Sequence, residues 1–176
     1  MTQRVAPLLR RANAADAGLL AELGARTFYD TFAADNKPAD MAAYLAAAFS
    51  PEQQAAELAD PRACFLLAEI DGRAVGYAAL RASDVPLCVM GGKPIELVRL
   101  YVAQEWHVQG VGAALMRACL AEAQQAGYQT MWLGVWEHNR RAQRFYRKWD
   151  FNVVGEHIFQ LGADPQTDLL MERALA

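Results

Sequence analysis

The chain has 176 residues, 54% of them hydrophobic and 21% charged, with a formal net charge of −3 at pH 7. This balance is typical of a soluble globular protein, and the acidic net charge argues against a general nucleic-acid binder. No apolar stretch is long enough for a secretion signal or a bilayer span, so we expect one cytoplasmic domain over residues 1–176, with no membrane partner. The three cysteines and three histidines show no metal-ligand spacing, and no metal site is predicted.

The first sixty residues predict an edge strand followed by helices. An apolar run near residues 5–9 is typical of a short strand, and Asn13 is placed to cap a helix over residues 14–32. A second helix should begin at Pro38. A third is expected over residues 50–60, because Ser-Pro-Glu is a strong start signal.

Residues 64–80 predict a β-hairpin. Two apolar runs, 64–70 and 74–80, are separated by Asp71-Gly72, a dipeptide that favours a tight turn between strands. Residues 83–94 contain two prolines and two glycines and are expected to form a loop.

The region from residue 95 to residue 127 predicts a strand, a glycine turn and a helix. Apolar and β-branched residues fill 95–103, the turn reads His-Val-Gln-Gly-Val-Gly over 107–112, and a helix rich in Ala, Leu and Met runs to Gly127. Small residues at 110 and 112 would let an anion approach the first amides of the helix. On the turn alone, an ordinary tight connection is the better interpretation.

The last quarter of the chain predicts one buried strand, one helix and a second hairpin. The strand is expected over 129–136, parallel to the strand at 95–103, because strand, helix, strand gives a right-handed crossover. Asn139 should cap the helix that follows. Runs over 151–161 and 167–175, separated by Gly-Ala-Asp-Pro-Gln, complete an α/β (α+β) fold with six or seven strands.

The glycine turn departs from the common nucleotide motifs. A dinucleotide fingerprint would need glycine at position 115, where the chain has leucine, and a phosphate loop would need Gly-Lys-Ser/Thr. The order of three downstream features is more specific: His107 to Gly112, then Asn139, then a helix with Phe145-Tyr146.

Together these features resemble the GCN5-related N-acetyltransferase superfamily, whose turn usually begins with Arg or Gln. Here His107 stands at that position, and Asp150 stands where the family usually has glycine. The resemblance implies a central mixed, mostly antiparallel sheet with a splayed parallel pair, flanked by helices. It also implies acetyl-CoA as co-substrate. The expected contacts are main-chain and side-chain groups of Leu100, Tyr101, Val102, His107, Val108, Gln109, Gly110, Val111, Gly112, Asn139 and Tyr146.

A closer resemblance covers nearly the whole chain and points to the bacterial PaiA-type spermidine/spermine acetyltransferases. It rests on segments such as Thr27-Phe28, 132–137 and 166–169, together with His157 and Phe159. It implies a small polyamine acceptor. Two alternatives stay open: an enzyme that acetylates protein or peptide amines, and a non-catalytic acyl-CoA sensor. The sequence does not decide between monomer and homodimer.

Tyr146 is the expected catalytic residue that stabilises the departing thiolate, by a hydrogen bond that strengthens as the sulfur becomes anionic. The alternative is that Tyr146 only packs with Phe145 and Trp149 beneath the sheet.

Glu96 is the expected base for the acceptor amine, because it is a charged residue within an apolar strand. Strict alternation would place it on the same face as Val98 and Leu100. The alternative is a solvated charge or a partner for Arg99 or Arg117.

Aromatic side chains are expected to line the acceptor site and hold a polyamine by its methylenes and by cation–π contact. Most of them are better explained as core, with Trp136 the best exception because it precedes Glu137, a second candidate base. The residues expected at this site are Phe28, Tyr29, Trp136 and Glu137, with Phe32 and Trp132 as further candidates.

Overall fold

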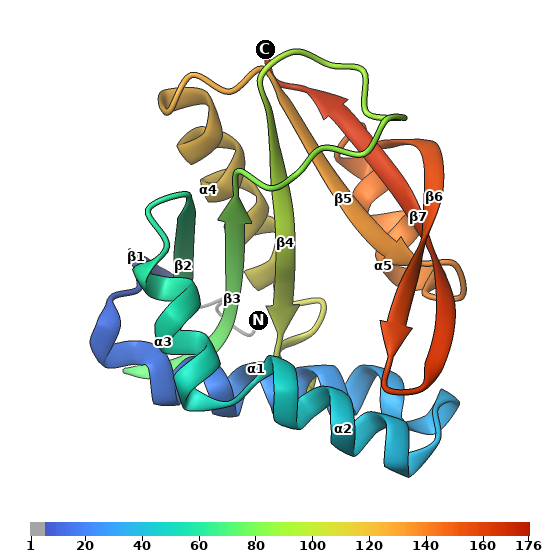
Figure 1. Ribbon diagram of the computed structural model, residues 1–176. Coiled ribbons are helices and arrows are strands. Elements are labelled where there is room, and N and C mark those ends of the chain that lie inside the picture. The colour runs from blue at the N-terminus through green and yellow to red at the C-terminus, as the bar shows by residue number, and fades with distance from the viewer. Residues whose placement is uncertain (1–5) are drawn as a thin grey trace.

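The computed structural model describes residues 6–176 as helices packed on both faces of one seven-stranded sheet (Figure 1). The strand order is β1-β2-β3-β4-β5-β7-β6, and every neighbouring pair is antiparallel except β4 and β5. The strands are β1 (Leu8–Arg11), β2 (Ala63–Ile70), β3 (Arg73–Arg81), β4 (Pro94–Val102), β5 (Thr130–Trp136), β6 (Asn152–Leu161) and β7 (Asp164–Ala174). The predicted fold class is confirmed. The predicted edge strand is β1; Val5 lies outside the described residues.

Five helices begin at the signals expected from the sequence. They are α1 (Ala17–Phe32), α2 (Pro38–Ala48), α3 (Pro51–Ala59), α4 (Val111–Gln125) and α5 (Arg140–Lys148). The side chains of Asn13, Ser50 and Asn139 each accept a hydrogen bond from a first-turn amide, which satisfies donors that would otherwise lack partners. Asn13 caps a short 3₁₀ turn that leads into α1. No helix among the described residues is long and apolar enough to cross a bilayer.

The two faces of the sheet carry separate cores. On one face, α4 and α5 pack against strand residues such as Leu97 and Leu133. On the other, α1, α2 and α3 cover clusters built around Tyr77 and Phe28. Each strand in the middle of the sheet is therefore covered on both sides, which explains why β3 and β5 are apolar along most of their length.

Both predicted hairpins form, but the second has a shorter turn than expected. Asp71 and Gly72 have φ values of 50° and 73°, the left-handed pair that suits a two-residue turn. In the C-terminal hairpin only Gly162 and Ala163 lie between the strands, and Pro165 belongs to β7 opposite Gln160. A proline is tolerated there because β7 pairs with β5 only from Asp168 onward.

The parallel pair β4 and β5 separates soon after it begins. The strands pair only over Pro94–Glu96 and Thr130–Trp132, although β4 continues to Val102 and β5 to Trp136. In Figure 1 the two strands meet at the top of the sheet and diverge downward. Since β3 and β7 occupy their outer edges, the facing backbone groups of the diverging segments have no partner strand. The result is a gap inside the sheet.

A β-bulge in β4 changes which side chains share a face. The register with β3 shifts between Ala79, opposite Arg99, and Leu80, opposite Leu97, so β4 has one extra residue. Leu100 consequently packs with the core beneath α4, whereas Val98 packs with the core beneath α1. The expectation that Glu96, Val98 and Leu100 share one face is therefore wrong for Leu100, because strict alternation fails at a bulge.

A buried ion pair ties helix α3 to the bulge. Arg99 donates to both carboxylate oxygens of Glu57, at 2.5 and 3.2 Å, and both side chains are mostly buried. The guanidinium also lies 5.1 Å from the ring centroid of Phe49. Removing one partner of such a pair leaves the other charge desolvated and uncompensated.

We expect Glu57→Gln to lower the free energy of unfolding by about 3 kcal/mol, because it leaves Arg99 buried without its counter-charge. The matched control is Glu52→Gln, which removes an exposed carboxylate from the first turn of the same helix. It should cost about 0.5 kcal/mol or less. Urea unfolding of both variants tests this, and equal losses would contradict the role given to the ion pair.

Candidate active site

The turn before α4 presents backbone amides to an incoming anion. Val108 and Gly110 have φ values of 58° and 91°, and α4 begins at Val111 without a side-chain cap from the described residues. A left-handed conformation is unusual for a β-branched residue such as valine. The turn and the uncapped helix start together leave several N–H groups free to bind a phosphate. The turn therefore presents N–H groups that are unbonded in the described structure over residues 108–112, within the range where the sequence predicts an anion site.

His107 connects this turn to the end of β4 and to helix α5. One ring nitrogen, Nδ1, lies 2.6 Å from Nη1 of Arg141, which can only donate, so Nδ1 must accept. The other, Nε2, then carries the proton and donates to the carbonyl oxygen of Val102 at 2.8 Å. His107 thus satisfies one carbonyl at the edge of the gap and holds a guanidinium beside the turn.

Tyr146 lies on α5, in the core between this helix and the sheet. It packs against Phe145 and Phe151, and burial raises its pKa well above the ordinary value. Its phenol also contributes to the raised pKa of Tyr101, a β4 residue whose pKa is raised mainly by burial. The two tyrosines, from opposite faces of the sheet, therefore lie near each other where the strands diverge. Among the described residues, the Tyr146 hydroxyl has no hydrogen-bond partner.

Glu96 lies where β4 and β5 part. It pairs in register with Trp132 on β5 and with Arg81 on β3, and its side chain is half-buried. Neither of the ion-pair partners considered from the sequence is used: Arg99 binds Glu57, and no contact with Arg117 occurs in the described residues. Glu96 is left without a salt bridge within residues 6–176.

An aromatic cluster spans the wide end of the gap. Phe28 of α1 contacts Tyr101 of β4, and Phe32 contacts Trp136 of β5, with centroid separations of 6.5 and 5.9 Å. Tyr44 of α2 stacks on Phe28 at 4.6 Å. Helix α1 therefore bridges the two diverging strands and lines the space between them.

Three of the residues expected at the acceptor site lie apart from this cluster. Tyr29 is 54% exposed on the outer side of α1. Glu137 is exposed next to His138, and Trp132 is buried against Val89 and Leu170. The spacing of these residues along the chain did not reveal this, because adjacent residues on a helix or strand point in different directions.

Sequence reasoning assigned no role to Asp168 and His157, which lie on neighbouring strands beside the aromatic cluster. Asp168 is opposite Trp136 on β5 and His157 on β6, and its Oδ2 is 3.7 Å from Nε2 of His157. Burial raises the pKa of Asp168 to about 6, while His157 opposes that rise. The sequence signal that could have indicated this site was Gly134, since a glycine inside a buried strand often marks a place where a ligand or another part of the chain approaches the backbone closely.

The tip of the β6–β7 hairpin lies next to the start of α2 and is hydrogen-bonded to it (Figure 1). Asp40 accepts a hydrogen bond from the Ala163 amide at 2.9 Å, and the amide of Gln166 donates to Asn36. Phe159 of β6 packs on Tyr44 at 5.3 Å. The β6–β7 hairpin and the start of α2 are thus joined beside the aromatic cluster, and this joined pair is called the arch below.

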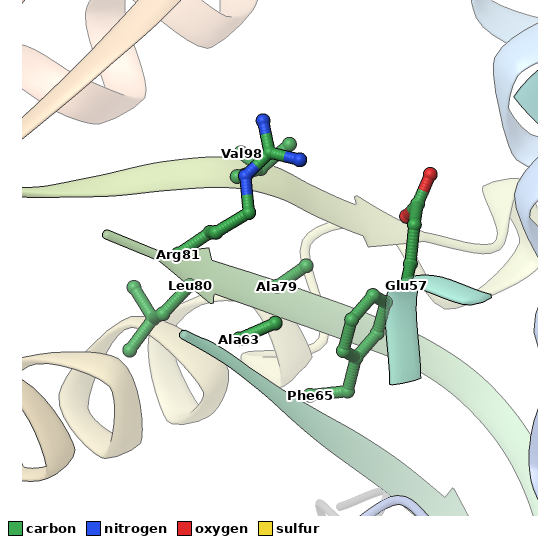
Figure 2. Close-up of a pocket in the computed structure, with 7 residues that line it drawn as sticks. All are labelled: Glu57, Ala63, Phe65, Ala79, Leu80, Arg81 and Val98. Carbon is green, nitrogen blue, oxygen red and sulfur yellow. The ribbon is translucent and has the colours of Figure 1, made fainter. Parts of the chain in front are cut away.

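A separate hollow beside α3 is too small to be the site. Figure 2 shows it between Glu57, Phe65 and Val98, on the face covered by α3. Its volume of about 10 Å³ is close to the space of one water molecule. No group of three or more potential metal ligands occurs among the described residues.

Comparison with known proteins decides the family. Residues 25–151 match the family described as the Acetyltransferase (GNAT) family. The chain belongs to the GNAT family of acetyltransferases. It is 40% identical over 160 residues to an uncharacterized N-acetyltransferase of Mycobacterium bovis, covering 91% of this chain and 98% of the relative. It is 34% identical over 149 residues to one in the pepI 3′ region of Lactobacillus delbrueckii subsp. lactis, covering 85% and 86%.

The GNAT fold is also found among solved structures. The PaiA N-acetyltransferase from Thermoplasma acidophilum, in complex with coenzyme A, matches with a TM-score of 0.76 at 20% identity, covering 97% of this chain and 99% of that chain. At this identity the match demonstrates a shared fold alone. The chain is therefore an N-acetyltransferase of the GNAT family, and its acceptor has to be argued from its own residues.

Two glycines at opposite ends of α4 allow a matched test of the anion-binding turn. Gly110 and Gly127 have φ values of 91° and 84°, and a Cβ at either would meet nothing within 4 Å. Alanine at either position should lower the free energy of unfolding by about 1 to 2 kcal/mol through backbone strain.

We expect only Gly110→Ala to weaken acetyl-CoA binding, because only that Cβ and strain lie at the turn. Binding is measured as the rise in melting temperature on adding acetyl-CoA, which follows from affinity for the folded state. Gly127→Ala should retain the rise of the unaltered protein. The same loss in both variants would show that the turn has no special role.

Proposed function

We propose that this N-acetyltransferase transfers an acetyl group from acetyl-CoA to a small cationic amine, a polyamine such as spermidine or spermine. The observation that carries the proposal is the gap between β4 and β5. It is bordered by the turn before α4 and by the aromatic cluster, beside which lie the carboxylate of Asp168 and the joined β6–β7 hairpin and α2.

The donor end of the gap fits coenzyme A. The amides of residues 108–112, which have no backbone partner among the described residues, suit the pyrophosphate, and Arg141, held by His107, adds a positive charge beside them. The unpaired edge of β4 at Leu100, Tyr101 and Val102 offers main-chain groups to the pantetheine arm. The coenzyme A bound by the PaiA structure supports this assignment. When bound, acetyl-CoA supplies an activated acetyl thioester.

Tyr146 would stabilise the leaving thiolate by donating a hydrogen bond from its phenol. Its raised pKa keeps the phenol protonated, which a hydrogen-bond donor requires. By ordinary values, full proton transfer from a phenol to a thiolate is uphill by about 2 kcal/mol, so a strengthened hydrogen bond is the simpler role. Asn139 is occupied as the cap of α5, which sets the position of Tyr146.

Glu96 would take the proton from the acceptor amine. It lies at the vertex of the gap and has no salt-bridge partner among residues 6–176, so its carboxylate is free to accept a proton directly or through water. The presence of both a candidate acid, Tyr146, and a candidate base, Glu96, argues for catalysis and against a sensor that only binds acyl-CoA.

The arch favours a small acceptor over a protein. The contacts of Asp40 with Ala163 and of Gln166 with Asn36 join the β6–β7 hairpin to the start of α2, and these contacts close one side of the proposed acceptor site. A protein lysine or terminus needs an open groove for the flanking chain. A polyamine can thread between aromatic faces and pair with a buried carboxylate.

The direct test is a thiol-release assay with acetyl-CoA against spermidine, spermine, monoamines of equal length, amino acids and peptides. We expect polyamines to react fastest, because a second ammonium can pair with an acidic group that a monoamine leaves unengaged. If a peptide amine is fast and every polyamine slow, the protein-acetylating alternative replaces our proposal. If nothing is acetylated while acetyl-CoA binds, the sensor alternative does.

Tyr146→Phe is expected to reduce kcat by about 10- to 1000-fold, the range for losing one hydrogen bond to a developing charge. The dissociation constant for acetyl-CoA should change little, because the bond strengthens only in the transition state. Tyr128→Phe, at the end of α4, serves as the control and should leave kcat unchanged. An undiminished kcat in Tyr146→Phe would reduce Tyr146 to a packing residue.

Glu96→Gln tests the base. An aliphatic amine has a pKa near 10, so at pH 7 about one molecule in a thousand is uncharged. The rate should therefore rise between about pH 7 and 9, and Glu96→Gln should lower it most at pH 7, where removal of the proton matters most. Glu137→Gln is the matched comparison. A pH profile unaltered in Glu96→Gln but flattened in Glu137→Gln would transfer the role to Glu137.

A further inference from the structure

Asp168 occupies an unusual place for a carboxylate. It sits on a strand inside the sheet, its side chain is only 14% exposed, and its one ion-pair partner in residues 6–176 is His157 at 3.7 Å. That separation is longer than a hydrogen bond, so the carboxylate oxygens keep unused acceptor capacity.

The space in front of Asp168 exists because β5 has a glycine there. A Cβ at Gly134 would lie 3.3 Å from Oδ2 of Asp168 and 3.4 Å from Nε2 of His157. Gly134 is exposed although its neighbours Leu133 and Val135 are buried. The carboxylate therefore lies over an open space above the face of β5, not over a packed side chain.

This opening lies on the acceptor side of the proposed reaction centre. Gly134 is two residues along β5 from Trp132, about 6.6 Å at the rise of a strand. Trp132 is the residue in register with Glu96, so the space beside Gly134 and Asp168 begins about two strand residues beyond the level of the proposed base. Trp136, directly opposite Asp168 on β5, adds an aromatic face to the same space.

The surroundings lack a cation that would satisfy the carboxylate. His157 of β6 is the one basic group close to it in the described structure, and Arg99 of β4 is already bound to Glu57. Tyr44 of α2 faces the same region, since Asp168 contributes to the raised pKa of its phenol. Burial outweighs His157 and raises the pKa of Asp168 to about 6, so the fold gains nothing from this charge.

We propose that Asp168, oriented by His157 and given room by Gly134, binds the positively charged ammonium of the acceptor. The inference rests on the proposed function, because it names the group that would recognise the amine in that reaction. A desolvated carboxylate beside aromatic faces selects cations over neutral molecules of the same size. His157 holds the carboxylate in place without occupying both of its oxygens.

The test compares Asp168→Asn with Glu156→Gln. Both remove one carboxylate from the β6–β7 hairpin, but Glu156 is exposed and alternates to the other face from His157. With the acceptor that the unaltered enzyme uses best, Asp168→Asn should raise KM for that amine by about 10- to 100-fold, as for loss of a charge-assisted hydrogen bond. The dissociation constant for acetyl-CoA should stay the same, and Glu156→Gln should match the unaltered enzyme in both.

A second variant, Gly134→Ala, changes no charge but places a methyl group against both Asp168 and His157. It should also raise the acceptor KM while leaving acetyl-CoA binding intact.

The melting temperature of Asp168→Asn distinguishes a binding role from a structural ion pair, because loss of a structural ion pair would lower it. Because the pKa of Asp168 is raised on folding, its contribution to stability falls as pH rises from about 4 through 6. Asp168→Asn should therefore melt no lower than the unaltered protein at pH 7.5, with its relative advantage shrinking toward pH 4.

The acceptor KM should also depend on pH in a way that Asp168→Asn removes. Protonation of Asp168 below about pH 6 abolishes its charge, so KM of the unaltered enzyme should rise as pH falls from 7 to 5. An acceptor KM unchanged in Asp168→Asn, with acetylation intact, overturns this inference and leaves the proposed function standing. A lower melting temperature at pH 7.5 with equal loss toward every acceptor would also overturn it. Failure of the unaltered protein to acetylate any amine would overturn the proposed function itself.

Discussion

The divergence of β4 and β5 is the constraint on which the rest of the structure depends. Each strand is held on its outer edge, β4 by β3 and β5 by β7, so neither can shift to rejoin the other after three paired residues. Unpaired backbone groups inside a sheet have to be satisfied by something. In this protein His107 takes one carbonyl, and the others face a gap that is bordered by the turn before α4 and by the aromatic cluster. The opening is therefore a property of the strand pairing.

The fold treats its buried charges in two different ways. Glu57 and Arg99 form a close pair that anchors α3 to the bulge, which compensates for their burial. Asp168 is also buried, yet its partner His157 is more distant and does not offset the loss of water. A charge left partly uncompensated at a functional site is expected where a ligand completes it. Stability and recognition are thus assigned to separate carboxylates on the same face of the sheet.

The elements themselves followed from local signals in the sequence. Asn13, Ser50 and Asn139 cap helices because their short side chains reach first-turn amides, and Asp71-Gly72 forms a turn because both residues tolerate positive φ. The turn before α4 and the position of Tyr146 on α5 were recognisable for the same reason. Each depends on residues close together in the chain, whose backbone preferences act before any tertiary contact forms.

Which side chains surround the proposed acceptor site was decided only by the tertiary structure. The bulge in β4 moved Leu100 to the other face, and the direction of α1 exposed Tyr29 while burying Phe28. Asp168 lies beside the aromatic cluster because the strand order places β7 beside β5. The sequence by itself determined the helices and the turns, including the turn before α4, since these are local. Strand order, register and burial join residues far apart in the chain, and no local periodicity encodes which side chains they bring together.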